Sequence, residues 1–168
     1  MAQFRSRISG TGSYLPEKRL SNDDLAKLVE TNDQWIVERT GIRARRIAAE
    51  GEFTSDLALH ASRLALAEAK LTASEIDMIL VATVSPDQPM PNTACVLQHK
   101  LGARDCMAVD ISAACTGFVY GLSIADQFIR SGTYKNILVV GAEILHRYVS
   151  YKDRETCILF GDAAGACV

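Results

Sequence analysis

The chain has 168 residues, 48% of them hydrophobic, and a formal net charge of -2 at pH 7. This is enough for one sizeable core and too little for two ordinary domains, so we expect a single globular unit. The charge argues against broad binding of nucleic acid or anionic membranes. No apolar run reaches the roughly eighteen residues of a membrane span, and residues 1–10 lack the apolar core of a secretory signal. We expect a cytoplasmic protein whose partners include neither nucleic acid nor membrane.

The N-terminal part begins with a predicted strand and turn in "FRSRISGTGSYLP", residues 4–16. Ser21 then stands as a cap before a helix predicted over 22–30. A short helix, "DQWIVERT", covers 33–40 and stops at Gly41. A longer amphipathic helix is predicted from Thr54 or Ser55 to about Lys70.

The remaining chain alternates apolar strands with helices. Strands are predicted over 76–85, 106–112, 136–142 and 163–168, and helices over 93–102 and 116–132. Uninterrupted apolar strands are typical of parallel sheets covered by helices on both faces, so we predict a layered α/β fold. The sequence stops at Val168 inside a predicted strand, from which we expect a fragment or one half of a larger unit.

The cysteines do not indicate a disulfide framework or a metal site. They are odd in number, lie mostly in apolar segments and form no C-x-x-C pair. Most are expected to be reduced core residues. The five are Cys95, Cys106, Cys115, Cys157 and Cys167.

Cys115 differs from the others because it lies where a strand passes into a helix, in "DISAACTGFVYGL". A helix that begins near Thr116 directs unpaired N–H groups and a partial positive charge at this residue. Such a position stabilises a thiolate and can bind an oxyanion. Gly117 and Gly121 would allow close approach of another backbone or a substrate chain, with the larger apolar residues on the opposite helix face. The alternative is that Cys115 is only a small buried hydrophobe.

Trp35 and Arg39 are four residues apart on a predicted helix and share a face. Three more arginines follow within seven residues, at 43, 45 and 46. An indole beside guanidinium groups suits a nucleotide, by stacking on the base and by charge on the phosphates. The alternatives are a solvated arginine face or a surface for an acidic carrier protein.

Several motifs in register resemble one family, ketoacyl-ACP synthase III, the initiating condensing enzyme of bacterial fatty acid synthesis. They are "GTGSYLPE", "TNDQWIVERTGIRARRIA", "DISAACTGF", "SIADQFIRSG" and "LFGDAAGA". The resemblance covers essentially the whole chain and corresponds to the family's N-terminal half. It implies a thiolase-like half-domain over residues 1–168, with a mixed, mostly parallel five-stranded sheet covered by helices.

The resemblance implies that Cys115 takes an acetyl or other short acyl group from acyl-CoA and condenses it with malonyl-ACP, with loss of carbon dioxide. This is covalent catalysis, and the CoA thioester is a substrate, so no separate cofactor is expected. The family's catalytic histidine and asparagine come from its C-terminal half. His60, His99 and His146 belong to no motif, so we expect the chain alone to be acylated without completing condensation.

The resemblance also assigns the adenine-nucleotide end of CoA to Trp35 and Arg39, with Thr31 nearby and Arg154 packing on the other side of the adenine. It implies a homodimer formed through the sheet of this half, to which 93–102 and 106–111 are candidate contributors. The loop around Met90, where the family often has phenylalanine, would close the partner's acyl pocket; otherwise it is a proline-stiffened surface loop. Asp162 and the motif around it are expected to be structural.

Two other classes of protein stay open from the sequence. One is a related thiolase-fold enzyme: a thiolase, a hydroxymethylglutaryl-CoA synthase or a starter enzyme with another acyl group. The other is a non-catalytic thiolase-like partner or fragment that is inactive without a C-terminal half.

Overall fold

The computed structural model describes residues 5–168. Its strands are β1 (Thr11–Tyr14), β2 (Lys18–Ser21), β3 (Ala44–Ile47), β4 (Met78–Ala82), β5 (Met107–Ile111), β6 (Ile137–Ile144) and β7 (Asp162–Cys167). Its α-helices are α1 (Asn22–Leu25), α2 (Asp33–Thr40), α3 (Thr54–Ala69), α4 (Thr93–Leu101), α5 (Gly117–Arg130) and α6 (Arg154–Cys157). Short 3-10 turns cover Ala73–Glu75, Ala114–Thr116 and Leu145–Arg147. Within residues 5–168, none of the helices has the length and apolar character that crossing a bilayer requires.

Five strands form the main sheet, in the order β1-β7-β6-β4-β5. β4 pairs in parallel with both β5 and β6, whereas β7 is antiparallel to its neighbours β6 and β1. Four strands therefore run in one direction and β7 runs against them. This confirms the predicted mixed, mostly parallel five-stranded sheet.

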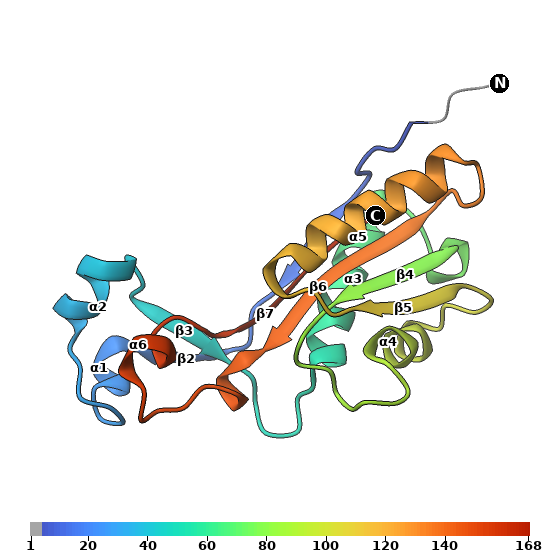
Figure 1. The fold of residues 1–168 in the computed structure, drawn as a ribbon. Helices are drawn as coiled ribbons and strands as arrows, with labels where there is room; N and C mark the ends of the chain where they lie inside the picture. Colours follow the sequence, from blue (N-terminus) through green and yellow to red (C-terminus); the bar gives the residue numbers. More distant parts are fainter. Residues whose placement is uncertain (1–4) are drawn as a thin grey trace.

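Helices cover both faces of this sheet (Figure 1). α3 and α4 pack on one face with alternate strand residues such as Ile79, Val81 and Val140, and α5 packs on the other with Leu80 and Val139. β4 is buried along its whole length, because each of its side chains meets one of these two helix layers. The apolar run that the sequence shows at 78–82 follows from this double cover.

A smaller lobe lies at one end of the sheet (Figure 1). It holds α1, α2, α6 and an antiparallel two-stranded sheet of β2 and β3, around a separate apolar cluster that includes Leu25, Ile36 and Ile158. This small sheet was not predicted from the sequence. Its strands carry three arginines and a lysine, and its contacts are made with residues far along the chain.

α2 and α4 lie where they were predicted and end at the predicted glycines. Asn32 and Asn92 accept hydrogen bonds from the N–H groups of Trp35 and Cys95, both at 2.8 Å, and Gly41 and Gly102 end these helices with positive φ.

Two predicted elements differ from the structure. The opening strand is confined to Thr11–Tyr14, and Phe4 of the predicted segment lies outside the described residues. The helix predicted over 22–30 ends at Leu25, although Ser21 caps it as expected. A turn follows in which Val29 still packs against the apolar cluster of the small lobe, so the apolar spacing is satisfied without a longer helix.

Candidate functional site

Cys115 lies at the edge of the sheet where the parallel strands β4, β5 and β6 end. It occupies the 3-10 turn Ala114–Thr116, between β5 and α5, and its side chain is exposed. Ala114, just before it, has a φ of 46°, which costs about 1 kcal/mol for a residue with a Cβ atom. The Thr116 hydroxyl donates a hydrogen bond to the carbonyl of Ala113 at 2.8 Å. The turn thus holds the thiol outward in a strained but hydrogen-bonded conformation.

The start of α5 differs in detail from the prediction. The helix begins at Gly117, and the N–H groups of Thr116 and Gly117 already donate to the carbonyls of Ala113 and Ala114. These two amides are therefore occupied within the turn. The first turn of α5 contains no acidic residue, and no side chain caps the helix, so its partial positive charge is not offset locally.

Of the two predicted roles for the glycines of α5, close approach of another part of the protein is the one that the structure supports. A Cβ atom on Gly117 would lie 3.0 Å from Cβ of Ala82, and one on Gly121 would lie 2.9 Å from Cγ1 of Val139. The segments that approach α5 at these glycines are thus strands of the protein's own sheet. Phe118 and Leu122 also pack toward the sheet, which corrects the expected division into opposite faces.

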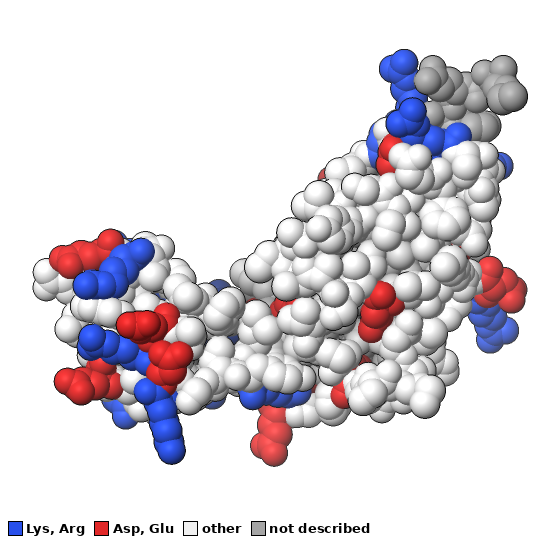
Figure 2. All heavy atoms as spheres, viewed as in Figure 1, with Lys and Arg blue, Asp and Glu red and all other residues white. Residues whose placement is uncertain are grey.

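The outer face of α5 exposes Val119, Tyr120 and Ile124. Figure 2 shows that the surface on this side carries few charged side chains, whereas Lys, Arg, Asp and Glu gather over the small lobe. This leaves a largely uncharged face beside the Cys115 turn.

Cys115 opens into an apolar pocket with a volume of about 720 Å³. The pocket extends from the turn along the end of β6 to α6. Its lining residues are Ala82, Val84, Ala114, Cys115, Phe118, Gly141, Ala142, Glu143, Leu145, Tyr148, Val149, Ser150, Thr156 and Phe160. A small acyl group would find mostly hydrocarbon around it here. Apart from Cys115 itself, the sequence singled out none of these residues as pocket lining.

The other four cysteines do not share this position. Cys157 and Cys167 are buried, and Cys95 and Cys106 are half-buried. Burial raises the pKa of the thiols of Cys106, Cys157 and Cys167. The expectation that most cysteines are inward-facing agrees with this distribution.

Trp35, Arg39 and Arg154 come together in the small lobe. The guanidinium carbon of Arg39 lies 4.3 Å from the centre of the Trp35 ring, and that of Arg154 lies 4.7 Å from it. Arg39 is one helical turn from Trp35, whereas Arg154 reaches it from α6. The hydroxyl of Thr31, just before α2, is buried and makes no hydrogen bond within the described residues. The four predicted nucleotide-binding residues thus belong to one region of the molecule.

The neighbouring arginines do not act as one patch. Arg43 is exposed, but Arg45 is 5% exposed and donates to the Ile158 carbonyl at 2.6 and 2.9 Å and to Asn22 at 2.7 Å. Burial lowers the pKa of its guanidinium. Arg46 donates to the carbonyl of Pro16 at 3.0 Å. Arg45 and Arg46 therefore hold β3 to other parts of the chain instead of facing a ligand.

The three histidines lie away from the pocket around Cys115, whose described lining contains none of them. His60 stacks on Tyr14 with ring centres 4.5 Å apart, and His99 is exposed on α4. His146 hydrogen-bonds to Asp162, which is buried and also accepts the Ala48 N–H at 2.7 Å. The contacts of Asp162 agree with the structural role expected for it.

Met90 projects from the loop between β4 and α4 with 85% of its surface exposed. The loop leads into α4, and α4 packs against β5, the strand at one edge of the main sheet. A single chain leaves the outer edge of β5 unpaired within the described residues.

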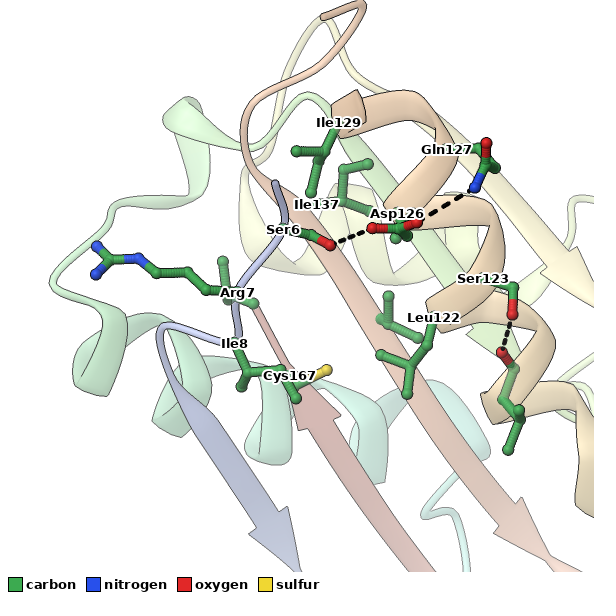
Figure 3. Close-up of a pocket in the computed structure, with 14 residues that line it drawn as sticks. Ser6, Arg7, Ile8, Leu122, Ser123, Asp126, Gln127, Ile129, Ile137 and Cys167 are labelled. Carbon is green, nitrogen blue, oxygen red and sulfur yellow. Dashed lines mark hydrogen bonds between the residues drawn. The ribbon is translucent and has the colours of Figure 1, made fainter. Parts of the chain in front are cut away.

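A second pocket, of about 530 Å³, lies between α5, β7 and residues 6–8 (Figure 3). Ser6 donates to Asp126 of α5 across it, and Leu122 and Ile137 contribute apolar walls, while Arg7 points away. Its lining includes the charged residues Arg7 and Asp126 and no part of the Cys115 turn. This pocket was not predicted from the sequence.

Comparisons with known proteins agree with the predicted resemblance. Residues 109–168 match the family model described as 3-oxoacyl-[acyl-carrier-protein (ACP)] synthase III. A beta-ketoacyl-[acyl-carrier-protein] synthase III of Xanthomonas oryzae pv. oryzae is 58% identical over 163 residues, which are 97% of this chain and 50% of that protein. The chain spans about half the length of the curated relatives it matches.

Solved structures share the fold. The 3-oxoacyl-[acyl-carrier-protein] synthase III of Aquifex aeolicus VF5 superposes with a TM-score of 0.94 and 53% identity, over 96% of this chain and 52% of that one. A priming beta-ketosynthase from the R1128 polyketide biosynthetic pathway superposes with a TM-score of 0.94 and 37% identity, over 99% and 51%. The predicted resemblance and the thiolase-like fold class are confirmed.

Proposed function

We propose that this chain is the cysteine-bearing N-terminal half of a 3-oxoacyl-ACP synthase III. The observation that carries the proposal is the exposed thiol of Cys115 on a strained turn, at the mouth of an apolar pocket and inside the segment that matches the family model. The uncapped N-terminus of α5 favours negative charge beside that thiol. A cytoplasmic location is part of the same proposal.

The reaction begins when the Cys115 sulfur bonds to the carbonyl carbon of an acyl-CoA thioester. The carbon–sulfur bond to CoA breaks, and CoA leaves as its thiol with the proton that Cys115 gave up. In the second step malonyl-ACP loses carbon dioxide, and the resulting carbanion attacks the acyl group on Cys115. A 3-oxoacyl-ACP forms as the bond to the Cys115 sulfur breaks, and Cys115 leaves as a thiolate that regains its proton from water.

Helix α6 connects the two parts of the proposed CoA site. Arg154 lies over the Trp35 ring, and Thr156, two residues later, lines the pocket of Cys115. A CoA molecule whose adenine stacks at Trp35 could therefore run along α6 to the thiol. Because Arg154 already lies 4.7 Å from the ring centre, it must move aside before an adenine can insert between the two groups.

Acylation is tested by mass spectrometry of the chain after incubation with acetyl-CoA. We expect one acetyl group on the peptide that contains Cys115. If neither the chain alone nor the chain mixed with a C-terminal half accepts an acyl group from any short acyl-CoA, the proposal is wrong, and a non-catalytic thiolase-like partner becomes the better description.

Condensation should not proceed with this chain alone. The described lining of the pocket contains neither a histidine nor an asparagine, the side chains that would stabilise the carbanion in the family. With acetyl-CoA and malonyl-ACP we expect an acyl-enzyme but no acetoacetyl-ACP, measured by mass spectrometry of the carrier protein. Formation of acetoacetyl-ACP by the isolated chain would show that this division of the catalytic groups is mistaken.

Replacement of Trp35 by alanine should raise the KM for acetyl-CoA by about tenfold, because stacking of a base on an aromatic ring contributes about 1–3 kcal/mol. The rate at saturating acetyl-CoA should change by less than about threefold. The measurement is the single-turnover rate of acylation across a range of acetyl-CoA concentrations, with the concentration at half-maximal rate taken as KM.

Two controls separate nucleotide binding from general damage. Acetyl-pantetheine has no adenine, so Trp35→Ala should leave its KM unchanged. Phe53→Ala removes a second ring that has an arginine, Arg147, 5.8 Å from its centre but lies outside the pocket of Cys115. Equal effects of the two alanine variants, or kinetics unchanged by Trp35→Ala, would argue against a CoA site at Trp35.

We further propose that two such chains pair through β5 and that Met90 of each reaches the partner's acyl pocket. The position of β5 at the sheet edge and the exposure of Met90 support this. The uncharged outer face of α5, with Val119, Tyr120 and Ile124, would instead be covered by the C-terminal half of the enzyme.

A further inference from the structure

The pocket of Cys115 contains one carboxylate among its described lining residues, that of Glu143. Glu143 is the last residue but one of β6, and its side chain is half-buried. A charged group in a wall otherwise made mostly of hydrocarbon needs strong hydrogen-bond partners to be stable there. Its partners all come from the segment just after β4.

Both oxygens of Glu143 accept hydrogen bonds from this segment. Oε1 accepts the N–H of Val84 at 2.9 Å, and Oε2 accepts the hydroxyl of Thr83 at 3.2 Å and also that of Ser85. Ser85 is only 2% exposed, and its Oγ in turn accepts the N–H of Ile144 at 2.8 Å. The carboxylate therefore fastens the end of β6 to three consecutive residues that follow β4.

The same segment is joined to the strand that leads to Cys115 and to the start of α3. The N–H of Thr83 donates to the carbonyl of Ile111, the last residue of β5, at 3.2 Å. The carbonyl of Ser85 accepts the hydroxyl of Thr54 at 2.5 Å. Val84, whose amide Glu143 holds, exposes 40% of its surface and is itself part of the pocket wall.

We propose that Glu143 is a positioning residue that fixes Val84 as a wall of the acyl pocket and so limits the length of the acyl group that Cys115 accepts. This rests on the proposed function for the identity of the natural substrate. Without the carboxylate, the amide of Val84 and the hydroxyl of Thr83 lose their partner, and Val84 can withdraw from the pocket. Longer chains then gain access to the thiol, while short ones gain little.

The test compares acylation of Cys115 by acetyl-CoA and by hexanoyl-CoA in four proteins: wild type, Glu143→Ala, Glu143→Gln and Ser85→Ala. We expect the ratio of hexanoyl to acetyl rates to rise about tenfold in Glu143→Ala and in Ser85→Ala, within the range that a few methylene groups produce in a hydrophobic pocket. In Glu143→Gln the side-chain oxygen can still accept the N–H of Val84, and the hydroxyls of Thr83 and Ser85 can turn to accept from the amide nitrogen. Its ratio of hexanoyl to acetyl rates should therefore stay within about threefold of wild type.

Glu52→Ala is the matched control. Glu52 also accepts two hydrogen bonds, from the Tyr14 hydroxyl at 2.8 Å and the Ala49 N–H at 2.9 Å, but it does not line the pocket of Cys115. An equal fall of both acylation rates in Glu143→Ala with an unchanged ratio, or the same rise in Glu52→Ala, would overturn the proposal. If Glu143→Ala does not fold, the ratio of hexanoyl to acetyl rates in Ser85→Ala decides the proposal in its place.

A second readout does not depend on CoA. Alkylation of Cys115 by N-ethylmaleimide and by N-hexylmaleimide, followed by peptide mass spectrometry, measures the space beside the thiol directly. If wild type is not acylated by any acyl-CoA, the proposed function fails, but the ratio of hexyl to ethyl alkylation still decides the role of Glu143. That ratio should rise about tenfold in Glu143→Ala, and an unchanged ratio would refute the positioning role.

Discussion

Replacement of Cys115 by serine is expected to abolish transfer of the acetyl group from acetyl-CoA, with a fall in acylation rate on the order of a thousandfold or more. A serine hydroxyl stays protonated near neutral pH, and the polarity at the start of α5 is too small to ionise it. Because Cys115 is exposed, its replacement should change the free energy of unfolding of the protein by less than about 0.5 kcal/mol. Intact-mass spectrometry after incubation with acetyl-CoA measures the first effect, and urea unfolding measures the second.

Cys95→Ser is the control for this experiment. Cys95 is half-buried on α4, with its Sγ 3.8 Å from the carbonyl of Ala108, and it takes no part in the pocket. The acylation rate of Cys95→Ser should equal that of wild type within about twofold. An acetyl group that persists in Cys115→Ser and moves to another cysteine would assign the nucleophile elsewhere.

The position of Cys115 could be predicted because it depends on local sequence. An apolar strand, a run of small residues and an apolar helix follow one another from 107 to 130, and the junction between them is where the structure places the turn. The positive φ of Ala114 could not be predicted, since alanine is not a residue that favours it. The pocket could not be predicted either, because its walls combine residues from four separate segments between 82 and 160.

The same distinction explains the rest of the fold. α2 and α4 carry their own start and stop signals, and β4 carries a continuous apolar run. The small sheet of β2 and β3 carries no such signal, because it is held by contacts such as that of Arg45 with Ile158, 113 residues away. Local spacing could pair Trp35 with Arg39, but only the family resemblance suggested Arg154, which the structure places at the same ring.

Replacement of Gly12 by alanine should lower the free energy of unfolding by about 3 kcal/mol or more, the upper end of what overpacking a core produces. β1 lies against α3 so closely that a Cβ atom on Gly12 would be 2.1 Å from the Ala61 carbonyl oxygen and 2.6 Å from the Ala65 nitrogen. Both contacts are with helix backbone, which no side-chain rotation can relieve. α3 cannot retreat either, since Ala61 and Ala65 are fully buried against the sheet. Urea unfolding followed by circular dichroism gives the measurement.

Gly165→Ala tests whether this effect comes from the close approach or from any added methyl group in the sheet. Gly165 lies in β7, beside β1, and pairs with Ser13, but a Cβ atom there would have no atom within 4 Å. Alanine at this position should leave stability unchanged or raise it by up to about 1 kcal/mol, because it restricts the unfolded chain. Similar losses in both variants would mean that the sheet tolerates no side chain at either glycine, and that contact with α3 is not what requires Gly12. A large loss in Gly12→Ala alone would show that the "GTG" segment is needed to seat β1 on α3, and with it the sheet whose opposite edge carries β5 and the turn of Cys115.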